Sequence, residues 1–293
     1  MISGSIVALV TPFKNGKVDE KKLTELVDFQ IHNGTNGIVP CGTTGESPTL
    51  SYEEHNRVIE ICIKAAERRV PVIAGTGSNS TAEAVELTRH AAEAGADAVL
   101  IVSPYYNKPT QKGLYAHFKT IATAVDIPII LYNIPGRAAC NIEPATIAQL
   151  AQDCKTIIGV KEASRSLAQM QDIKRLCPEE FLLLSGDDAL LLPVLSIGGK
   201  GVISVAANIV PQDIVQIITA YADGHVKKAQ DMSYRLLPLV QALFLETNPI
   251  PVKTAMGLMG LCSDELRLPL SPMSDSNKDK LKNVLKDFNL IKS

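Results

Sequence analysis

The sequence lacks the features that would assign it to a nucleic-acid-binding or membrane protein. It has no run of Lys and Arg, its formal net charge is −2, and charged residues make up 20% of it. We therefore expect no nucleic-acid partner. No segment approaches the roughly 20 consecutive apolar residues that span a bilayer. The apolar stretch at residues 5–10 lacks the positive flank of an export signal. We expect a cytoplasmic protein with no membrane partner.

Motifs for disulfide, metal and nucleotide chemistry are missing as well. The six cysteines are scattered without a CxxC pair, which fits reduced thiols. The five histidines show no HExxH or other ligand spacing, so we expect no metal site. No GxGxxG follows a predicted strand, and no GxxxxGK[ST] is present. We therefore expect a protein without a cofactor.

What the chain does have is a regular alternation of short apolar runs with amphipathic stretches. We predict eight strands, at Ser5–Leu9, Gly37–Pro40, Val72–Gly75, Ala98–Val102, Pro128–Tyr132, Ile157–Lys161, Phe181–Ser185 and Gly201–Ser204. Between them, Ser51-x-x-Glu54 and Ser80-x-x-Glu83 are typical of capping boxes at helix starts. Eight strands alternating with helices favour a parallel (β/α)8 TIM barrel, an α/β fold, over a doubly wound sheet.

The strand pattern stops after about residue 225. We predict helices over residues 227–245, 249–261 and 276–289, separated by proline-containing breaks. We interpret residues 1–224 as the barrel that carries the active site and residues 225–293 as a C-terminal helical domain packed on it. The sequence does not indicate what these helices, or Lys253 within them, do beyond packing.

In a parallel barrel the functional side chains lie at the carboxyl ends of the strands. Lys161 ends the apolar run of residues 157–160. Desolvation at such a position favours the neutral amine, which can attack a ketone and form a Schiff base. The alternative is an ordinary solvated strand end.

Other strand ends carry groups that bind anions or move protons. The turn over residues 42–45 is Gly-Thr-Thr-Gly, which offers N–H groups and hydroxyls to a carboxylate, or is simply a glycine-rich turn. The phenols of Tyr132 and Tyr106 can relay protons when a hydroxyl such as that of Thr44 holds them. Taken alone, each tyrosine would be an amphipathic core residue.

Two further strand ends carry charged residues. Arg137 follows a Pro-Gly turn and can hold a carboxylate through two parallel hydrogen bonds, although a lone loop arginine is more often solvated. Asp187 and Asp188 follow the seventh strand, and we expect both to cap the next helix rather than to act in catalysis.

Four segments together resemble the dihydrodipicolinate synthase family, in order and over essentially the whole chain. They are Gly42–Glu46, Tyr132–Arg137, Lys161 and Thr247–Lys253. The family is a branch of the pyruvate-dependent class I aldolases. The resemblance implies a lyase that condenses pyruvate with aspartate-4-semialdehyde, in the branch of lysine biosynthesis that runs through diaminopimelate.

The resemblance also implies how the first substrate is bound. Lys161 would form the Schiff base with pyruvate, whose carboxylate would rest on Thr43 and Thr44. Gly186 and Ile203 would line the same pocket.

For the second substrate, the resemblance implies proton transfer and a second carboxylate grip. Tyr132 would shuttle protons, and Thr44 would link it to Tyr106, which reaches across from a neighbouring subunit in the family. Arg137 would hold the carboxylate of aspartate-4-semialdehyde. The cross-subunit tyrosine implies a homo-oligomer, at least a tight dimer and in the family usually a dimer of dimers.

The resemblance further suggests feedback inhibition by L-lysine. In lysine-sensitive members the inhibitor binds at a subunit interface, and six residues match its positions: Ser47, Leu50, His55, Asn79, Glu83 and Tyr105. Glu83 could pair with the amine of the inhibitor. Tyr52 stands where a histidine is often found, so this chain departs from the pattern there.

Two other functions remain open at this point. One is another pyruvate-lysine aldolase, such as N-acetylneuraminate lyase or a keto-deoxy sugar-acid aldolase, which shares the lysine, the tyrosine and the glycine-rich turn. Arg137 discriminates, because neuraminate lyases as a group lack it. The other is a non-catalytic barrel that binds a keto acid. Lys161, Tyr132, Thr44 and Tyr106 together argue against it, because a binder needs no relay of an amine and phenols.

Overall fold

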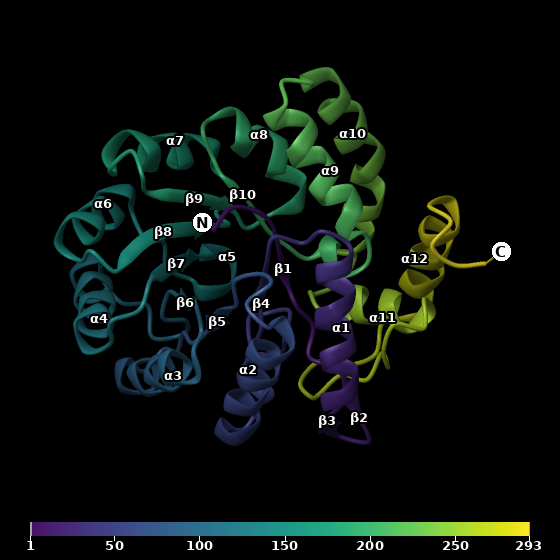
Figure 1. The fold of residues 1–293 in the computed structure, drawn as a ribbon, viewed down its shortest axis with the longest axis horizontal. Coiled ribbons are helices and arrows are strands. Elements are labelled where there is room, and N and C mark those ends of the chain that lie inside the picture. Colours follow the sequence, from purple (N-terminus) through teal and green to yellow (C-terminus); the bar gives the residue numbers. More distant parts are fainter. Residues whose placement is uncertain (1, 293) are drawn as a thin grey trace.

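Eight parallel strands form the centre of the computed structural model, which describes residues 2–292 (Figure 1). They are β1 (Gly4–Ala8), β4 (Gly37–Val39), β5 (Ile73–Gly75), β6 (Ala98–Val102), β7 (Ile129–Asn133), β8 (Ile157–Glu162), β9 (Leu182–Ser185) and β10 (Gly201–Ser204). The order is β4-β1-β10-β9-β8-β7-β6-β5. A bridge between Ile38 and Val72 joins the two ends, so the sheet is a nearly closed barrel.

Helices surround the barrel and then continue beyond it (Figure 1). The helices around the strands are α1 (Glu20–His32), α2 (Tyr52–Ala66), α3 (Thr81–Ala94), α4 (Gln111–Ala124), α5 (Pro135–Ala138), α6 (Pro144–Asp153), α7 (Leu167–Leu176), α8 (Leu191–Ser196) and α9 (Pro211–Ala222). Three more follow, α10 (Val226–Ala242), α11 (Ile250–Leu258) and α12 (Asp275–Asp287). Among residues 2–292, no helix is both long and apolar enough to cross a bilayer.

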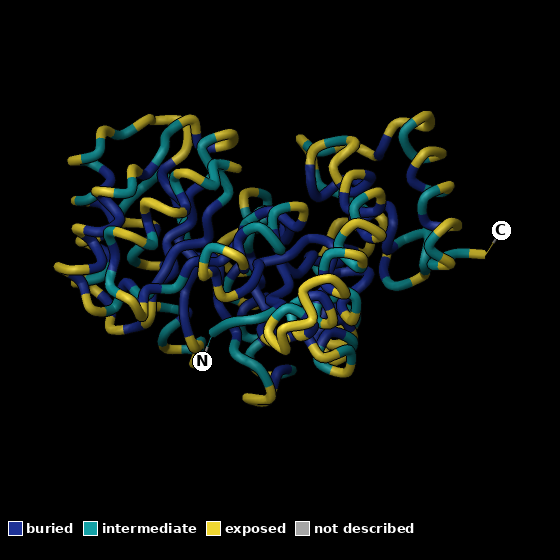
Figure 2. The backbone as a smooth tube through the Cα atoms, turned by 90° about the horizontal axis from the view of Figure 1, so that it is seen from above, coloured by how far each residue is buried: buried dark blue, intermediate teal, exposed yellow. Residues whose placement is uncertain are grey.

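The alternation of side chains along each strand divides the apolar core in two. One set fills the barrel and includes Ile6, Ile130, Leu184 and Ile203. The other lies between the strands and the helices. Burial on both faces explains why each strand is an unbroken apolar run rather than an alternating one. Figure 2 shows the buried strands inside and exposed residues on the outer turns of the helices.

The predicted fold class is confirmed, and every predicted strand agrees with the structure to within one residue at each end. The three C-terminal helices are confirmed too, but they end earlier than predicted; α10, for example, ends at Ala242 rather than at residue 245. The division at residue 224 into two domains stays a prediction.

One of the two predicted capping boxes is wrong. At the start of α2 the Ser51 hydroxyl accepts the Glu54 N–H, and the Glu54 carboxylate accepts the Ser51 N–H. At α3, Ser80 accepts the Glu83 N–H, but the Glu83 carboxylate accepts the Ser78 hydroxyl at 2.7 Å instead of closing the box. A second hydroxyl close by competes for the same carboxylate, which the four-residue pattern does not include.

The expectation that both Asp187 and Asp188 cap the following helix is half right. Asp187 does so, through a hydrogen bond from the Ala189 N–H. Asp188 instead accepts hydrogen bonds from the Ser204 hydroxyl and the Val205 N–H at the end of β10. Burial raises the pKa of the Asp188 carboxyl, against the effect of these hydrogen bonds. The carboxylate serves instead as the acceptor for these buried donors at and after the end of β10, which would otherwise be unpaired.

A short hairpin was not predicted. It pairs β2 (Phe13–Lys14) with β3 (Lys17–Val18) in antiparallel fashion. Asn15 and Gly16 form its turn with φ values of 53° and 78°. Asn-Gly is the preferred pair for such a turn, so the signal was present in the sequence.

Candidate active site

Tyr132 and Lys161 lie side by side inside the barrel. They are paired residues in the ladder of β7 and β8, near the carboxyl end of both strands. Both side chains are buried, and the Lys161 Nζ lies 4.1 Å from the centroid of the Tyr132 ring. An ammonium over an aromatic face is attracted by the ring quadrupole. No carboxylate within the described residues forms an ion pair with Lys161, so its amine is not held by a structural salt bridge.

The residues that follow Tyr132 and Lys161 in their strands, Asn133 and Glu162, face outward and are hydrogen-bonded to each other. The Asn133 amide donates to the Glu162 carboxylate at 3.0 and 3.2 Å. The same carboxylate accepts the Ser164 N–H at 2.7 Å and the Gln169 amide at 3.0 Å. Glu162 is completely buried. This network fixes the ends of β7 and β8, and hence the positions of Tyr132 and Lys161.

The turn over residues 42–45 follows β4 and holds two N–H groups free. Among the described residues, the N–H groups of Thr43 and Thr44 donate to no other residue. The Thr11 hydroxyl binds the Gly45 carbonyl at 2.6 Å and holds the end of the turn. Successive unpaired backbone donors of this kind attract an anion.

Asn248, which precedes α11, connects this turn to Arg137. Its amide donates to the Thr44 hydroxyl at 3.0 Å. Its backbone carbonyl accepts the Arg137 guanidinium at 2.9 Å. Arg137 itself is exposed, on the short helix α5 after β7. A buried residue of the C-terminal segment thus touches both candidate carboxylate-binding groups.

A cavity of about 600 Å³ opens among these elements. Thr43, Tyr132 and Arg137 line one part of it. Five of the six candidate lysine-binding residues line it as well: Ser47, Leu50, His55, Glu83 and Tyr105. The sixth, Asn79, donates from its amide to the Tyr105 carbonyl at 3.1 Å. The cavity therefore joins three of the candidate catalytic and substrate-binding residues to most of the candidate lysine site, whereas Lys161 and Thr44 are not part of its lining.

Of the three remaining candidate residues, two lie in the barrel and one is exposed to solvent. Ile203 is buried inside the barrel on β10, and Gly186 follows β9, where its N–H donates to the Glu162 carbonyl at 2.8 Å. Tyr106 is 88% exposed, on the loop between β6 and α4. The chain by itself does not bring Tyr106 to Tyr132.

His55 is the buried titratable group of the candidate lysine site. Its Nε2 lies 2.9 Å from the Gly75 carbonyl oxygen, and burial lowers the pKa of the imidazole. Its Nδ1 has no partner among the described residues. Within residues 2–292, no group of three His, Cys, Asp or Glu side chains is arranged to hold a metal ion.

Comparison with models of known protein families shows to which family the chain belongs. The model of the dihydrodipicolinate synthetase family matches residues 1–288. The chain belongs to the dihydrodipicolinate synthetase family. This confirms the resemblance carried by the four sequence segments.

Individual members of the family are similar over their full length. The chain is 59% identical to 4-hydroxy-tetrahydrodipicolinate synthase of Syntrophus aciditrophicus, covering 99% of this chain and all of that one. Its structure matches the crystal structure of dihydrodipicolinate synthase from Aquifex aeolicus with a TM-score of 0.98, at 52% identity and complete coverage of both chains. It also matches the enzyme from Cyanidioschyzon merolae with lysine bound, with a TM-score of 0.96 at 42% identity and 99% coverage of both.

Two residues of the site were not given a role in advance. Asn248 lies in the segment Thr247–Lys253 that carries the resemblance, but no local pattern indicates its contact with Thr44, 204 residues away in the chain. Glu162 is adjacent to Lys161, and a carboxylate at the end of an apolar strand was a signal that it is buried and hydrogen-bonded.

We predict that Glu162→Ala lowers the free energy of unfolding by ~3 kcal/mol or more, because it removes a fully buried acceptor shared by the Asn133 amide, the Ser164 N–H and the Gln169 amide. Of these three, the two amides retain only the Asn141 amide oxygen as an acceptor. The matched control is Glu25→Ala, which removes only surface ion pairs with Lys21 and Lys22 and should lower it by less than about 1 kcal/mol. Urea denaturation followed by circular dichroism measures both. Equal losses for the two variants would contradict the role of the network.

Proposed function

We propose that this protein is a lyase that condenses pyruvate with L-aspartate-4-semialdehyde, forming 4-hydroxy-tetrahydrodipicolinate in the diaminopimelate route of lysine biosynthesis. The full-length similarity to 4-hydroxy-tetrahydrodipicolinate synthase supports this activity. The structural observation that carries the proposal is the Lys161 amine, buried over the Tyr132 ring and without a carboxylate partner.

The first half of the proposed reaction uses Lys161. Its neutral amine attacks the ketone carbon of pyruvate, and loss of water leaves an imine. The free N–H groups of Thr43 and Thr44 hold the pyruvate carboxylate, while Ile203 and Gly186 bound the methyl side. Donors fixed before the substrate arrives need no reorganisation during the reaction.

In the second half, the imine loses a proton from its methyl group and becomes an enamine. The enamine carbon adds to the aldehyde of the second substrate, whose carboxylate Arg137 holds. The amine of that substrate then displaces Lys161 and closes the ring. Tyr132 carries the protons of these steps. Thr44 accepts a hydrogen bond from Asn248, which leaves the Thr44 hydroxyl proton free to donate to a phenol.

A second candidate function is another pyruvate-lysine aldolase that acts on a sugar acid. It would use the same amine and the same turn, but it has no need for Arg137 at the cavity. The link from Arg137 through Asn248 to Thr44 favours a second carboxylate close to the first. A non-catalytic keto-acid-binding barrel explains the turn but not the pairing of Tyr132 with Lys161.

We further propose that the protein is a homo-oligomer, at least a dimer and in the family pattern a dimer of dimers, and that L-lysine inhibits it. The exposure of Tyr106 supports the homo-oligomer, because a tyrosine that reaches into the site of a neighbouring subunit is exposed in the single chain and becomes covered in the oligomer. The solved Cyanidioschyzon merolae enzyme with lysine bound supports the inhibition by L-lysine.

We predict that borohydride reduction in the presence of pyruvate inactivates the enzyme and leaves a pyruvate-derived adduct on the peptide that contains Lys161. Reduction traps the imine as a stable secondary amine. Peptide mass mapping locates it, and omission of pyruvate is the control. An unmodified Lys161 would leave the keto-acid-binding barrel as the better account.

We predict that Arg137→Lys raises the KM for aspartate-4-semialdehyde about tenfold or more, because Lys lacks the planar fork that binds a carboxylate at two points. Trapping of pyruvate on Lys161 should be unchanged. Arg235→Lys, at an exposed arginine that pairs with Asp213, is the control. Initial-rate kinetics decide, and an unchanged KM would favour the sugar-acid aldolase.

We predict partial, cooperative inhibition by L-lysine, which Glu83→Gln weakens about tenfold because the amide no longer carries the charge that pairs with the ammonium. Glu86 lies on the same helix and is exposed, and L-lysine should inhibit the Glu86→Gln variant as strongly as it inhibits the unaltered protein. Steady-state rates with and without lysine measure this, with sedimentation of the same samples giving the oligomeric state. Activity unaffected by saturating lysine would refute the prediction.

A further inference from the structure

The turn over residues 42–45 is bounded on both sides by residues in a backbone conformation that favours glycine. Cys41 has a φ of 55° and Glu46 a φ of 54°. Residues with a Cβ adopt this region only where their surroundings fix it. On the Cys41 side the backbone packs closely against β5, since a Cβ at Gly75 would come within 2.3 Å of the Cys41 carbonyl oxygen. On the other side the surroundings of Glu46 must supply the constraint.

Glu46 is held by a fully buried ion pair. The Lys253 Nζ on α11 lies 2.6 Å from Glu46 Oε1, and neither side chain is exposed. The backbone N–H of Arg267 donates to the other carboxylate oxygen, Oε2, at 3.1 Å. Lys253 also donates to the Glu265 carbonyl at 2.7 Å and lies 4.1 Å from the centroid of the Phe13 ring. Both carboxylate oxygens of Glu46 are therefore fixed in direction.

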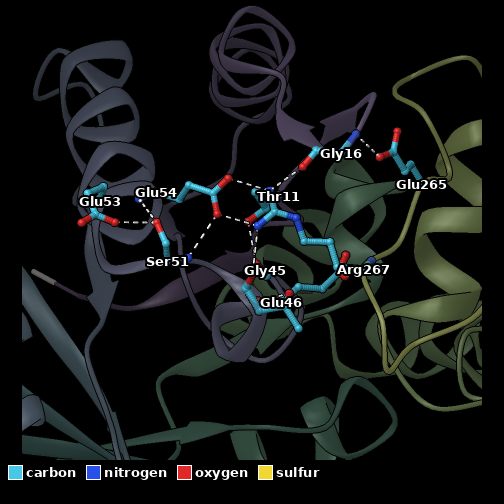
Figure 3. A network of polar contacts seen from close by, with 10 residues as sticks. Thr11, Gly16, Gly45, Glu46, Ser51, Glu53, Glu54, Glu265 and Arg267 are labelled. Atoms are coloured by element: carbon cyan, nitrogen blue, oxygen red, sulfur yellow. Dashed lines mark hydrogen bonds and ion pairs between the residues drawn. The ribbon is translucent and has the colours of Figure 1, made fainter.

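Arg267 ties this pair to the elements around it. Its guanidinium binds the Glu54 carboxylate at the start of α2 with both terminal nitrogens. It also donates to the Thr49 carbonyl at 2.9 Å and to the Gly16 carbonyl of the hairpin at 2.8 Å. Figure 3 shows Arg267 between Glu54 and the segment around Glu46, with chain from both ends of the protein converging on it.

Stability alone does not account for a buried ion pair in this place. Burial lowers the pKa of the Lys253 ammonium, against the opposing attraction of Glu46. Well-packed apolar residues of similar volume commonly give equal or greater stability than such a pair. Apolar contacts do not fix the orientation of a side chain as hydrogen bonds do. A fixed orientation of Glu46 matters because this residue lies directly beside the free N–H groups of Thr43 and Thr44.

We propose that the Glu46–Lys253 ion pair is a positioning device that fixes the carboxylate-binding turn, so that helix α11 of the C-terminal segment sets the affinity for pyruvate. The inference rests on the proposed function, in which this turn binds the pyruvate carboxylate. Glu46 and Lys253 touch no substrate and act through the backbone of the turn. Together with the contact of Asn248 with Thr44, the pair connects the start of α11 to the turn at one residue inside it and at one residue that bounds it.

The test is a pyruvate titration of borohydride trapping at Lys161. It compares the unaltered protein with Glu46→Gln, Lys253→Met and the double variant, each well below its thermal midpoint. We expect the half-saturating pyruvate concentration to rise about tenfold or more, while the amount trapped at saturating pyruvate stays within about twofold. The double variant leaves no unpaired buried charge, so it decides the question if the single variants do not fold.

The matched control is Glu246→Gln in the same C-terminal segment. The Glu246 carboxylate accepts hydrogen bonds from the Ser274 N–H and the Asn277 amide at the start of α12, and it accepts none from the turn. This variant should lower the thermal midpoint and leave the half-saturating concentration unchanged.

The other outcomes are distinguishable. A double variant with a lower thermal midpoint but an unchanged half-saturating concentration would show that the pair is merely structural and would overturn the inference. A lower maximum amount of adduct with an unchanged half-saturating concentration would overturn it too. Absence of any adduct in the unaltered protein would instead refute the proposed function itself.

Discussion

The register between β7 and β8 is the constraint on which the site depends. It sets Tyr132 opposite Lys161 and Asn133 opposite Glu162. Because side chains alternate across a strand, the first pair faces the barrel interior and the second faces the surrounding helices. A shift by one residue would exchange the two faces, placing the amine among the helices and the carboxylate inside the barrel. The hydrogen bonds around Glu162, on the outer face of the strands, therefore help to hold the register that places Tyr132 and Lys161 on the inner face.

Lys161 and Lys253 show how burial leads to different roles for the same side chain. Both lie on elements of the core and both have an aromatic ring close to the Nζ. Lys253 has a carboxylate at ion-pair distance and donates a further hydrogen bond to the Glu265 carbonyl. Lys161 is buried beside Tyr132 and has no such partner among the described residues. In the proposed function the first lysine carries the covalent chemistry, and in the proposed positioning role the second fixes the turn after β4.

The sequence predicted the barrel well because each strand is apolar throughout and is bounded by breaks. Strand ends then indicated where functional groups such as Lys161 should lie. Contacts with the C-terminal segment were not predictable, since the meeting of Asn248 with Thr44 depends on how α11 packs against the barrel. Asp188 was misassigned for a similar reason, as its donors belong to the next strand. The hairpin at residues 15–16, by contrast, had a clear local signal that was overlooked.

The distance in sequence between the turn and α11 has a consequence for synthesis on the ribosome. Glu46 precedes Lys253 by 207 residues, a length of chain that takes roughly 10–40 s to translate at common elongation rates. All eight strands emerge before α11 does. A nascent or prematurely released chain thus contains all eight strands and Lys161, yet it lacks the helix whose Lys253 pairs with Glu46.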